Sequence, residues 1–174
     1  MKIIGIVVAV LIVGVLIFAA TKPDIFRVQR SAAIKAPPEK VFALINDFKA
    51  WGAWSPWEKK DPAMKRTFGA TTSGKGAHYA WEGNKDVGQG SMEITESIPS
   101  SKITLKLDFL KPFEAHNTVE FTLAVQGDTT QVVWTMDGPA NFMSKLIQVF
   151  VSMDSMVGKD FESGLANLKA AAEK

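Results

Sequence analysis

The stretch from Pro139 to Lys174 decides the fold, and it reads PANFMSKLIQVFVSMDSMVGKDFESGLANLKAAAEK. Its apolar residues recur at gaps of three or four, which predicts one face of an α-helix sustained for about seven turns. A helix this long needs a broad apolar surface beside it, because packing stabilises most helices. The alternative is a break near Ser152–Ser155, which gives two helices and leaves the fold unchanged. The apolar positions are Met143, Leu146, Phe150, Met153, Val157, Phe161, Leu165 and Leu168.

Two glycines, Gly158 and Gly164, lie within this helical pattern. Each costs roughly 1 kcal/mol relative to alanine in a helix interior. We interpret them as positions at which the helix backbone approaches a sheet closely.

The first part of the chain predicts a membrane segment. Residues 3–20 are eighteen consecutive apolar or glycine residues, which span about 27 Å as a helix, close to a bilayer core. A signal peptide has a shorter apolar run and a cleavage site with small residues, whereas bulky Ile17 and Phe18 lie two positions before the two alanines. We therefore favour an uncleaved transmembrane anchor over 1–21 and one domain over 22–174.

The orientation of this anchor has two interpretations. Five basic residues follow the span within twenty positions, and the positive-inside rule alone would then place the domain in the cytoplasm. Folded domains behind a short N-terminal anchor are often exported regardless of nearby charge. We expect a bacterial protein of the cell membrane whose domain is exported to the periplasm.

Composition restricts the function classes. Apart from Lys2, the chain has 19 basic and 18 acidic residues, and they form no basic stripe that would predict a nucleic-acid partner. It has no cysteine, so disulfides, thiolate metal sites and cysteine nucleophiles are excluded. No zinc-protease motif or nucleophile elbow occurs, and His78 and His116 fall on polar strand faces. We expect no metal and no cofactor.

Between anchor and C-terminal helix, the chain alternates like an antiparallel meander. A strand over 26–34 precedes a helix that begins at Pro37–Pro38, and a tryptophan-rich loop follows over 47–62. Strands separated by turn signals are then expected at 64–70, 77–83, 87–98, 102–109, 114–126 and 130–137. This order predicts an α+β fold in which a curved antiparallel β-sheet wraps around the long C-terminal α-helix.

Five stretches together resemble the SRPBCC superfamily, the START-like or Bet v 1-like helix-grip proteins, and most closely its polyketide cyclase/dehydrase-type branch. They are Ile34–Phe42, Trp54–Trp57, Trp81–Asn84, Leu107–Phe113 and Met156–Leu165. Each motif is weak alone, but their order and spacing are fairly specific. The resemblance implies a deep cavity between sheet and helix that binds an apolar small molecule or lipid, with cyclase chemistry in some members only.

Aromatic and methionine residues are the candidate lining of this cavity, because they supply large, adaptable apolar surface. The loop tryptophans Trp51, Trp54 and Trp57 could form a lid over its mouth or touch the bilayer interface. Strand parity and helical spacing direct a further set to the same interior: Tyr79, Trp81, Met92, Phe109, Phe121, Trp134 and Met153.

Arg30 is the candidate charged residue of the interior, since it shares parity with Val28 and Ala32. A buried guanidinium needs a partner, and Glu96 has the parity to supply one. The functional interpretation is an anion anchor for a carboxylate or lipid headgroup. The structural alternative is an arginine at the rim whose charged end reaches water.

These patterns favour a membrane-anchored, monomeric binding protein for an apolar small molecule or lipid. One rival is a cyclase or hydrolase whose general acid is Glu82 or Glu96, with a pKa raised by burial. A second rival is a protein-interaction module at the membrane. A large closed cavity favours binding, convergent polar groups inside favour the enzyme, and an exposed apolar patch favours the module.

Overall fold

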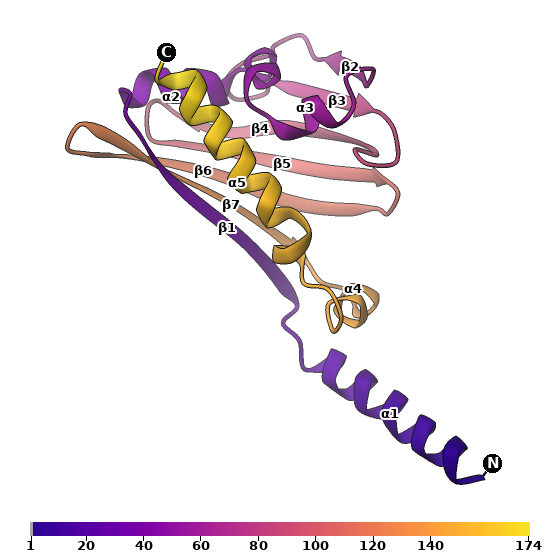
Figure 1. The fold of residues 1–174 in the computed structure, drawn as a ribbon. Coiled ribbons are helices and arrows are strands. Elements are labelled where there is room, and N and C mark those ends of the chain that lie inside the picture. Colours follow the sequence, from indigo (N-terminus) through magenta and orange to yellow (C-terminus); the bar gives the residue numbers. More distant parts are fainter. Residues whose placement is uncertain (1) are drawn as a thin grey trace.

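The computed structural model describes the backbone of residues 2–174 and the side chains of residues 3–174. One seven-stranded antiparallel sheet has the strand order β1-β7-β6-β5-β4-β3-β2 (Figure 1). The elements are α1 (Lys2–Ala20), β1 (Ile25–Ile34), α2 (Pro38–Asn46), the 3-10 helix η1 (Phe48–Ala53), α3 (Pro56–Lys60), β2 (Lys65–Phe68), β3 (His78–Glu82), β4 (Gln89–Ile98), β5 (Lys102–Lys111), β6 (Ala115–Gln126), β7 (Thr129–Pro139), α4 (Phe142–Ile147) and α5 (Met153–Ala172).

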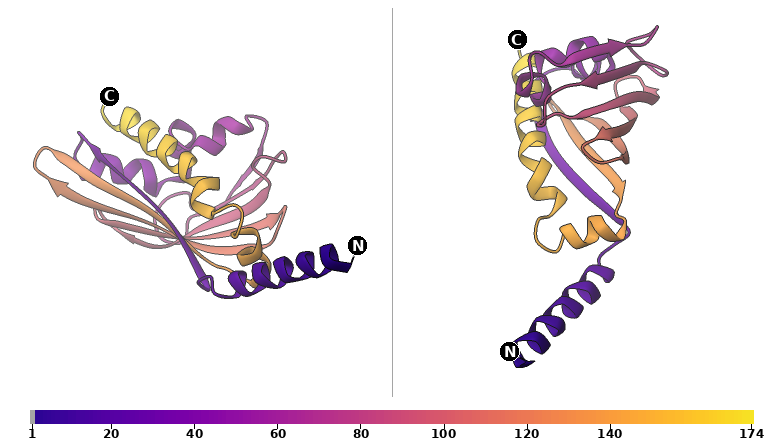
Figure 2. Two further views of the ribbon diagram at one scale, coloured as in Figure 1. Left: turned by 60° about the horizontal axis from the view of Figure 1, so that its bottom comes forward. Right: turned by 90° about the vertical axis from the view of Figure 1, so that its right-hand side faces the viewer.

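The sheet curves, and α5 lies across its concave face together with α2, η1 and α3 (Figures 1 and 2). Strands β2 to β7 follow one another as a meander, whereas β1 pairs with β7 from Ile25↔Pro139 to Ile34↔Thr130. The chain thereby brings its first strand beside its last strand, directly beneath α5. The predicted helix-grip architecture is confirmed.

Alternation along the strands assigned the faces correctly. Leu105 of β5, Phe121 of β6 and Val132 of β7 are fully buried. Lys106, which lies between two buried leucines, is exposed. One face of the sheet therefore forms the core with the helices, because successive strand residues point to opposite sides.

The single seven-turn helix predicted over 139–174 is wrong, and the alternative of two helices is confirmed. Asn141 caps α4 by accepting a hydrogen bond from the Ser144 amide at 2.8 Å, and Ser152 caps α5 through the Ser155 amide at 3.1 Å. A serine at the N-cap position marks the start of a helix. The apolar spacing continues across Ser152 and therefore does not reveal this start. As a result, Phe150 lies in the connection and is 75% exposed.

The two glycines of α5 lie where they were expected. A Cβ at Gly164 would stand 2.7 Å from Cζ3 of Trp134, in the packed core. A Cβ at Gly158 would collide with Nη2 of Arg30 on β1. The absence of a side chain at both positions lets α5 approach β1 and β7 closely.

Helix α1 projects away from the domain, with α4 beside its C-terminal end (Figure 2). Its segment Ile3–Ala20 has a mean hydropathy of 3.2, and only 6% of it is buried. By length and composition this helix is able to cross a membrane, and its apolar side chains are not used by the core.

Candidate functional site

The interior between α5 and the sheet is built around Trp134 of β7. Its ring stacks on Phe161 of α5 with centroids 4.0 Å apart and planes 12° apart. Phe121 also stacks on Trp134, with centroids 4.9 Å apart, and Trp54 meets the indole edge-on at 5.7 Å. These aromatic side chains fill the space beneath the middle of α5.

Two of the three loop tryptophans are core residues. Trp51 and Trp54 are 5% and 0% exposed, and their indole N–H groups donate to the carbonyl oxygens of Ile45 and Leu44 at 2.8 and 2.9 Å. The expected loop is instead η1 and α3, so neither ring reaches the bilayer interface. Trp57 is half-buried and meets Trp134 edge-on at 5.9 Å.

A second aromatic group lies on β3 and β5. Tyr79 stacks on Trp81 at 6.1 Å, and Trp81 meets Phe109 edge-on at 5.7 Å. The Tyr79 hydroxyl donates to Glu58 of α3 at 2.7 Å, and burial followed by this bond raises the pKa of Tyr79. Arg66 donates to the same carboxylate at 2.6 Å. These contacts connect α3 to β2 and β3. Sequence patterns did not single out Glu58 or Arg66, because their pairing depends on how separate elements pack together.

Three buried side-chain polar atoms carry no hydrogen bond among the described residues, and one of them, Nε2 of Gln148, lies at the end of α4. The two in the interior are Nε1 of Trp134, which is 2% exposed, and Oδ1 of Asn117, which is 5% exposed. Buried polar groups are normally paired, and each unpaired one calls for an explanation. A donor and an acceptor are thus left open on the concave faces of neighbouring strands β7 and β6. Asn117 was missed because it interrupts the apolar alternation of β6.

The register places Asn117 in a row across one end of the sheet. Leu107 pairs with Asn117, Met92 pairs with Leu107, and Phe26 pairs with Gly138. A Cβ at Gly138 would lie against both Oδ1 of Asn117 and the Phe26 ring, which shows how closely these residues pack.

Half-buried apolar side chains pack against the core at its margin. Five of them, called here the rim, are Phe26, Trp57, Phe109, Met153 and Val157, and the others are Ala32, Phe42 and Leu44. Among the predicted lining residues, Trp51, Trp54, Tyr79, Trp81, Met92, Phe121 and Trp134 are buried, whereas Trp57, Phe109 and Met153 are on the rim.

Arg30 pairs with α5, and the expected partner Glu96 is wrong. Its guanidinium donates to Asp154 and to Glu162, each at 2.7 Å, while Glu96 pairs with Lys102 on the exposed side of the sheet at 3.1 Å. The bond to Asp154 contributes most to raising the pKa of Arg30, and the same bond lowers the pKa of Asp154. The guanidinium of Arg30 is therefore already paired with two carboxylates, and these ion pairs hold α5 against β1.

Neither proposed general acid is in the interior. Glu82 and Glu96 are exposed, and the hydrogen bond from Lys102 lowers the pKa of Glu96 instead of raising it. Two surface pockets, of about 310 and 360 Å³, lie at the β6–β7 turn and beside the β3–β4 turn. Glu82 lines the second pocket, and none of the predicted aromatic residues lines either.

A family model described as "Polyketide cyclase / dehydrase and lipid transport" matches residues 26–173. A comparison with curated proteins gives no match.

Solved structures share the fold at low sequence identity. Protein CV1439 from Chromobacterium violaceum is 16% identical with a TM-score of 0.60, covering 88% of this chain and 99% of its own. The Aha1 dimer from Colwellia psychrerythraea is 16% identical with a TM-score of 0.61, covering 85% and 96%. Major latex-like protein 151 from Panax ginseng is 12% identical with a TM-score of 0.60, covering 87% and 100%. At these identities the likeness shows the fold alone.

Proposed function

Because the chain belongs to the polyketide cyclase/dehydrase and lipid transport family, we propose that its domain, residues 22–174, binds one apolar small molecule or lipid between α5 and the sheet. We further propose that residues 3–20 anchor it in a bacterial cell membrane, with the domain on the exported side. The alternative of catalysis by a buried acid has no support from Glu82 or Glu96, which are both exposed.

The observation that carries this proposal is the pair of unpartnered polar atoms in an otherwise apolar interior. The indole N–H of Trp134 is a donor and Oδ1 of Asn117 is an acceptor, so a hydroxyl or carboxylic acid on an apolar body would satisfy one of them. Apolar pockets with a few well-placed polar groups are typical of small-molecule sites. The ligand class that fits is therefore a long-chain alcohol, a fatty acid or a sterol.

Admission of such a ligand requires movement of the rim, because aromatic rings fill the interior in this structure. The first two turns of α5 are the part best suited to move. Met153 and Val157 are only half-buried there, and the connection that precedes α5 is exposed at Phe150 and Val151. Farther along, Phe161 and Leu165 are both 2% exposed and hold the rest of α5 on the sheet.

Ligand competition on residues 24–174 tests the proposal. A naphthalene fluorophore that brightens in apolar surroundings should bind the folded domain, and dodecanol should displace it at lower concentration than dodecane. Trp134→Phe keeps an aromatic ring but removes the N–H, so it should weaken dodecanol binding roughly three- to tenfold, the value of one hydrogen bond. Dodecane binding should be unchanged.

Trp54→Phe is the matched control. Its indole N–H already donates to the Leu44 carbonyl, so the substitution should lower stability without changing the preference for dodecanol over dodecane. A folded domain that neither takes up the fluorophore nor distinguishes the two competitors would contradict the proposal.

A further inference from the structure

The connection between the sheet and α5 carries an apolar surface that the core does not use. Within 142–151, five large apolar side chains are exposed, and we call them the α4 platform. They are Phe142 (50%), Met143 (63%), Ile147 (49%), Phe150 (75%) and Val151 (46%). An exposed apolar group of this kind marks an interaction site, because soluble surfaces rarely gather so many such residues.

The α4 platform has no free charge. Lys145 is the one charged residue between Asn141 and Met153, and its side chain is only 11% exposed. Its ammonium group donates to the Asp24 carboxylate at 2.5 Å and so points back toward the linker. The surface that remains outward is therefore apolar or neutral, which suits burial at the boundary between lipid headgroups and acyl chains.

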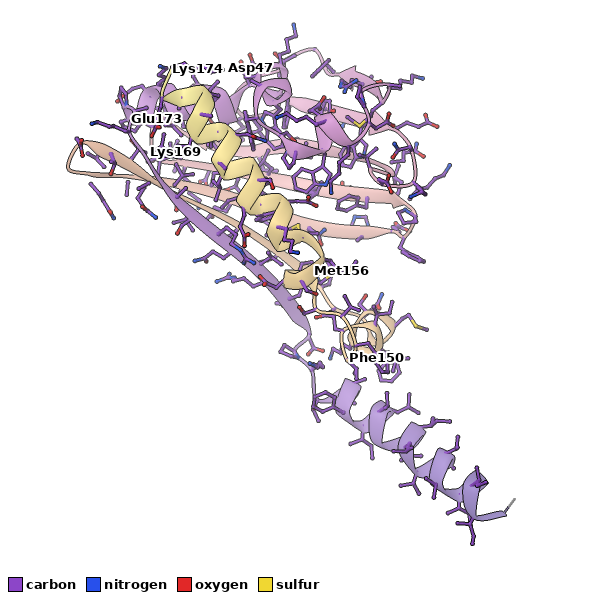
Figure 3. All side chains as sticks on the ribbon, in the orientation of Figure 1. Asp47, Phe150, Met156, Lys169, Glu173 and Lys174 are labelled. Atoms are coloured by element: carbon purple, nitrogen blue, oxygen red, sulfur yellow. The ribbon has the colours of Figure 1, made fainter. Side chains whose placement is uncertain are left out.

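The same contacts fix the α4 platform beside the end of α1. The Ala140 amide donates to the Asp24 carbonyl at 2.8 Å, so Asp24 holds both the backbone before α4 and the Lys145 side chain. Asp24 follows α1 by four residues, and α1 and α4 are in contact, with Ala19 fully buried. Figure 3 shows Phe150 at α4, on the side of the domain from which α1 extends. A bilayer that contains residues 3–20 would place its interface at this level.

We propose that the α4 platform inserts into the interface of the same bilayer that α1 spans, where Phe and other apolar side chains bury their surface in lipid. This inference rests on the proposed anchorage by α1. Met153 of the rim lies two residues after Val151, the last residue of the α4 platform, so docking places the proposed ligand opening at the lipid surface. The domain would then exchange its ligand with the membrane and not with bulk water.

Site-specific fluorescence of the full chain in lipid nanodiscs tests the proposal. The chain has no native cysteine, so Phe150→Cys, Val10→Cys and Val125→Cys each give a single labelling site for an environment-sensitive dye. Val10 is a 65% exposed residue of α1, and Val125 is an equally exposed residue at the far end of β6. Lipids with a spin label on the acyl chain then quench any dye that lies in the bilayer.

The expected result is that dyes at positions 10 and 150 lose roughly half or more of their emission, since an interfacial segment lies about 5–10 Å deep, while the dye at 125 is unchanged. Quenching at 10 without quenching at 150 would overturn the α4 proposal and leave the anchorage intact. A dye at 150 that is shielded from water but not quenched would mean that a protein covers the platform, which also overturns it. Absence of quenching at 10 would contradict the anchorage and this inference together.

Discussion

Truncation of Phe161 to alanine tests how α5 is held on the sheet. The ring is 2% exposed, stacks on Trp134 at 4.0 Å and meets Trp57 edge-on at 6.3 Å. Removal of a buried phenylalanine side chain costs about 3–5 kcal/mol, and the parallel stacking places this site in the upper part of that range. The free energy of unfolding of residues 24–174 should fall by that amount in a urea titration followed by tryptophan fluorescence.

Phe150→Ala is the matched control for this measurement. Both phenylalanines share the apolar spacing of the stretch, but Phe150 is 75% exposed, so its truncation in water should change the free energy of unfolding by less than about 0.5 kcal/mol. Equal costs for the two variants, or a cost below about 1 kcal/mol for Phe161→Ala, would refute the assignment of the helix face.

Three further predictions concern the Arg30 ion pairs, the close helix contact and the isolated domain. The hydrogen bond from Arg30 lowers the pKa of Asp154 in the folded protein. The stability that this pair contributes is therefore fully present above the ordinary carboxyl pKa of about 3.9, and it is lost as the pH falls through the lowered pKa of the folded state. Arg30→Gln should therefore flatten the acid limb of a plot of unfolding free energy against pH, and an unchanged limb would contradict this pairing. Gly164→Ala should cost about 1–3 kcal/mol because its Cβ meets the Trp134 ring, and a neutral result by urea titration would argue against the close approach. Residues 24–174 should unfold cooperatively and elute as a monomer, whereas aggregation or a stable dimer in light scattering would contradict this expectation.

Strand faces could be predicted from the sequence because alternation has a period of two and one face is buried. In β6, Val119, Phe121 and Leu123 are buried as expected, whereas the apolar pattern is interrupted by the buried Asn117 and ends where the strand leaves the core at Val125. The two α5 glycines were also interpretable, since a helix-interior glycine needs a local reason. These features are local, and local patterns are what a single sequence records.

The remainder depends on contacts between residues far apart in the chain. Parity placed Arg30 correctly toward α5 but could not choose Asp154 and Glu162 over Glu96, because the choice depends on where a distant helix crosses the sheet. Helical spacing continued through Ser152, so the break between α4 and α5 was a rival interpretation and not the favoured one. The unpaired atoms of Trp134 and Asn117 could only be found once every donor and acceptor had a position.

Native mass spectrometry of residues 24–174, purified from cells without refolding, tests the central claim most directly. The account predicts a species heavier than the bare chain by one small apolar molecule, which solvent extraction removes and an added fatty acid or sterol replaces. The Trp134→Phe variant should retain less of an alcohol or acid ligand than the unaltered domain. Only the bare mass, both as purified and after addition of these lipids, would contradict binding between α5 and the sheet.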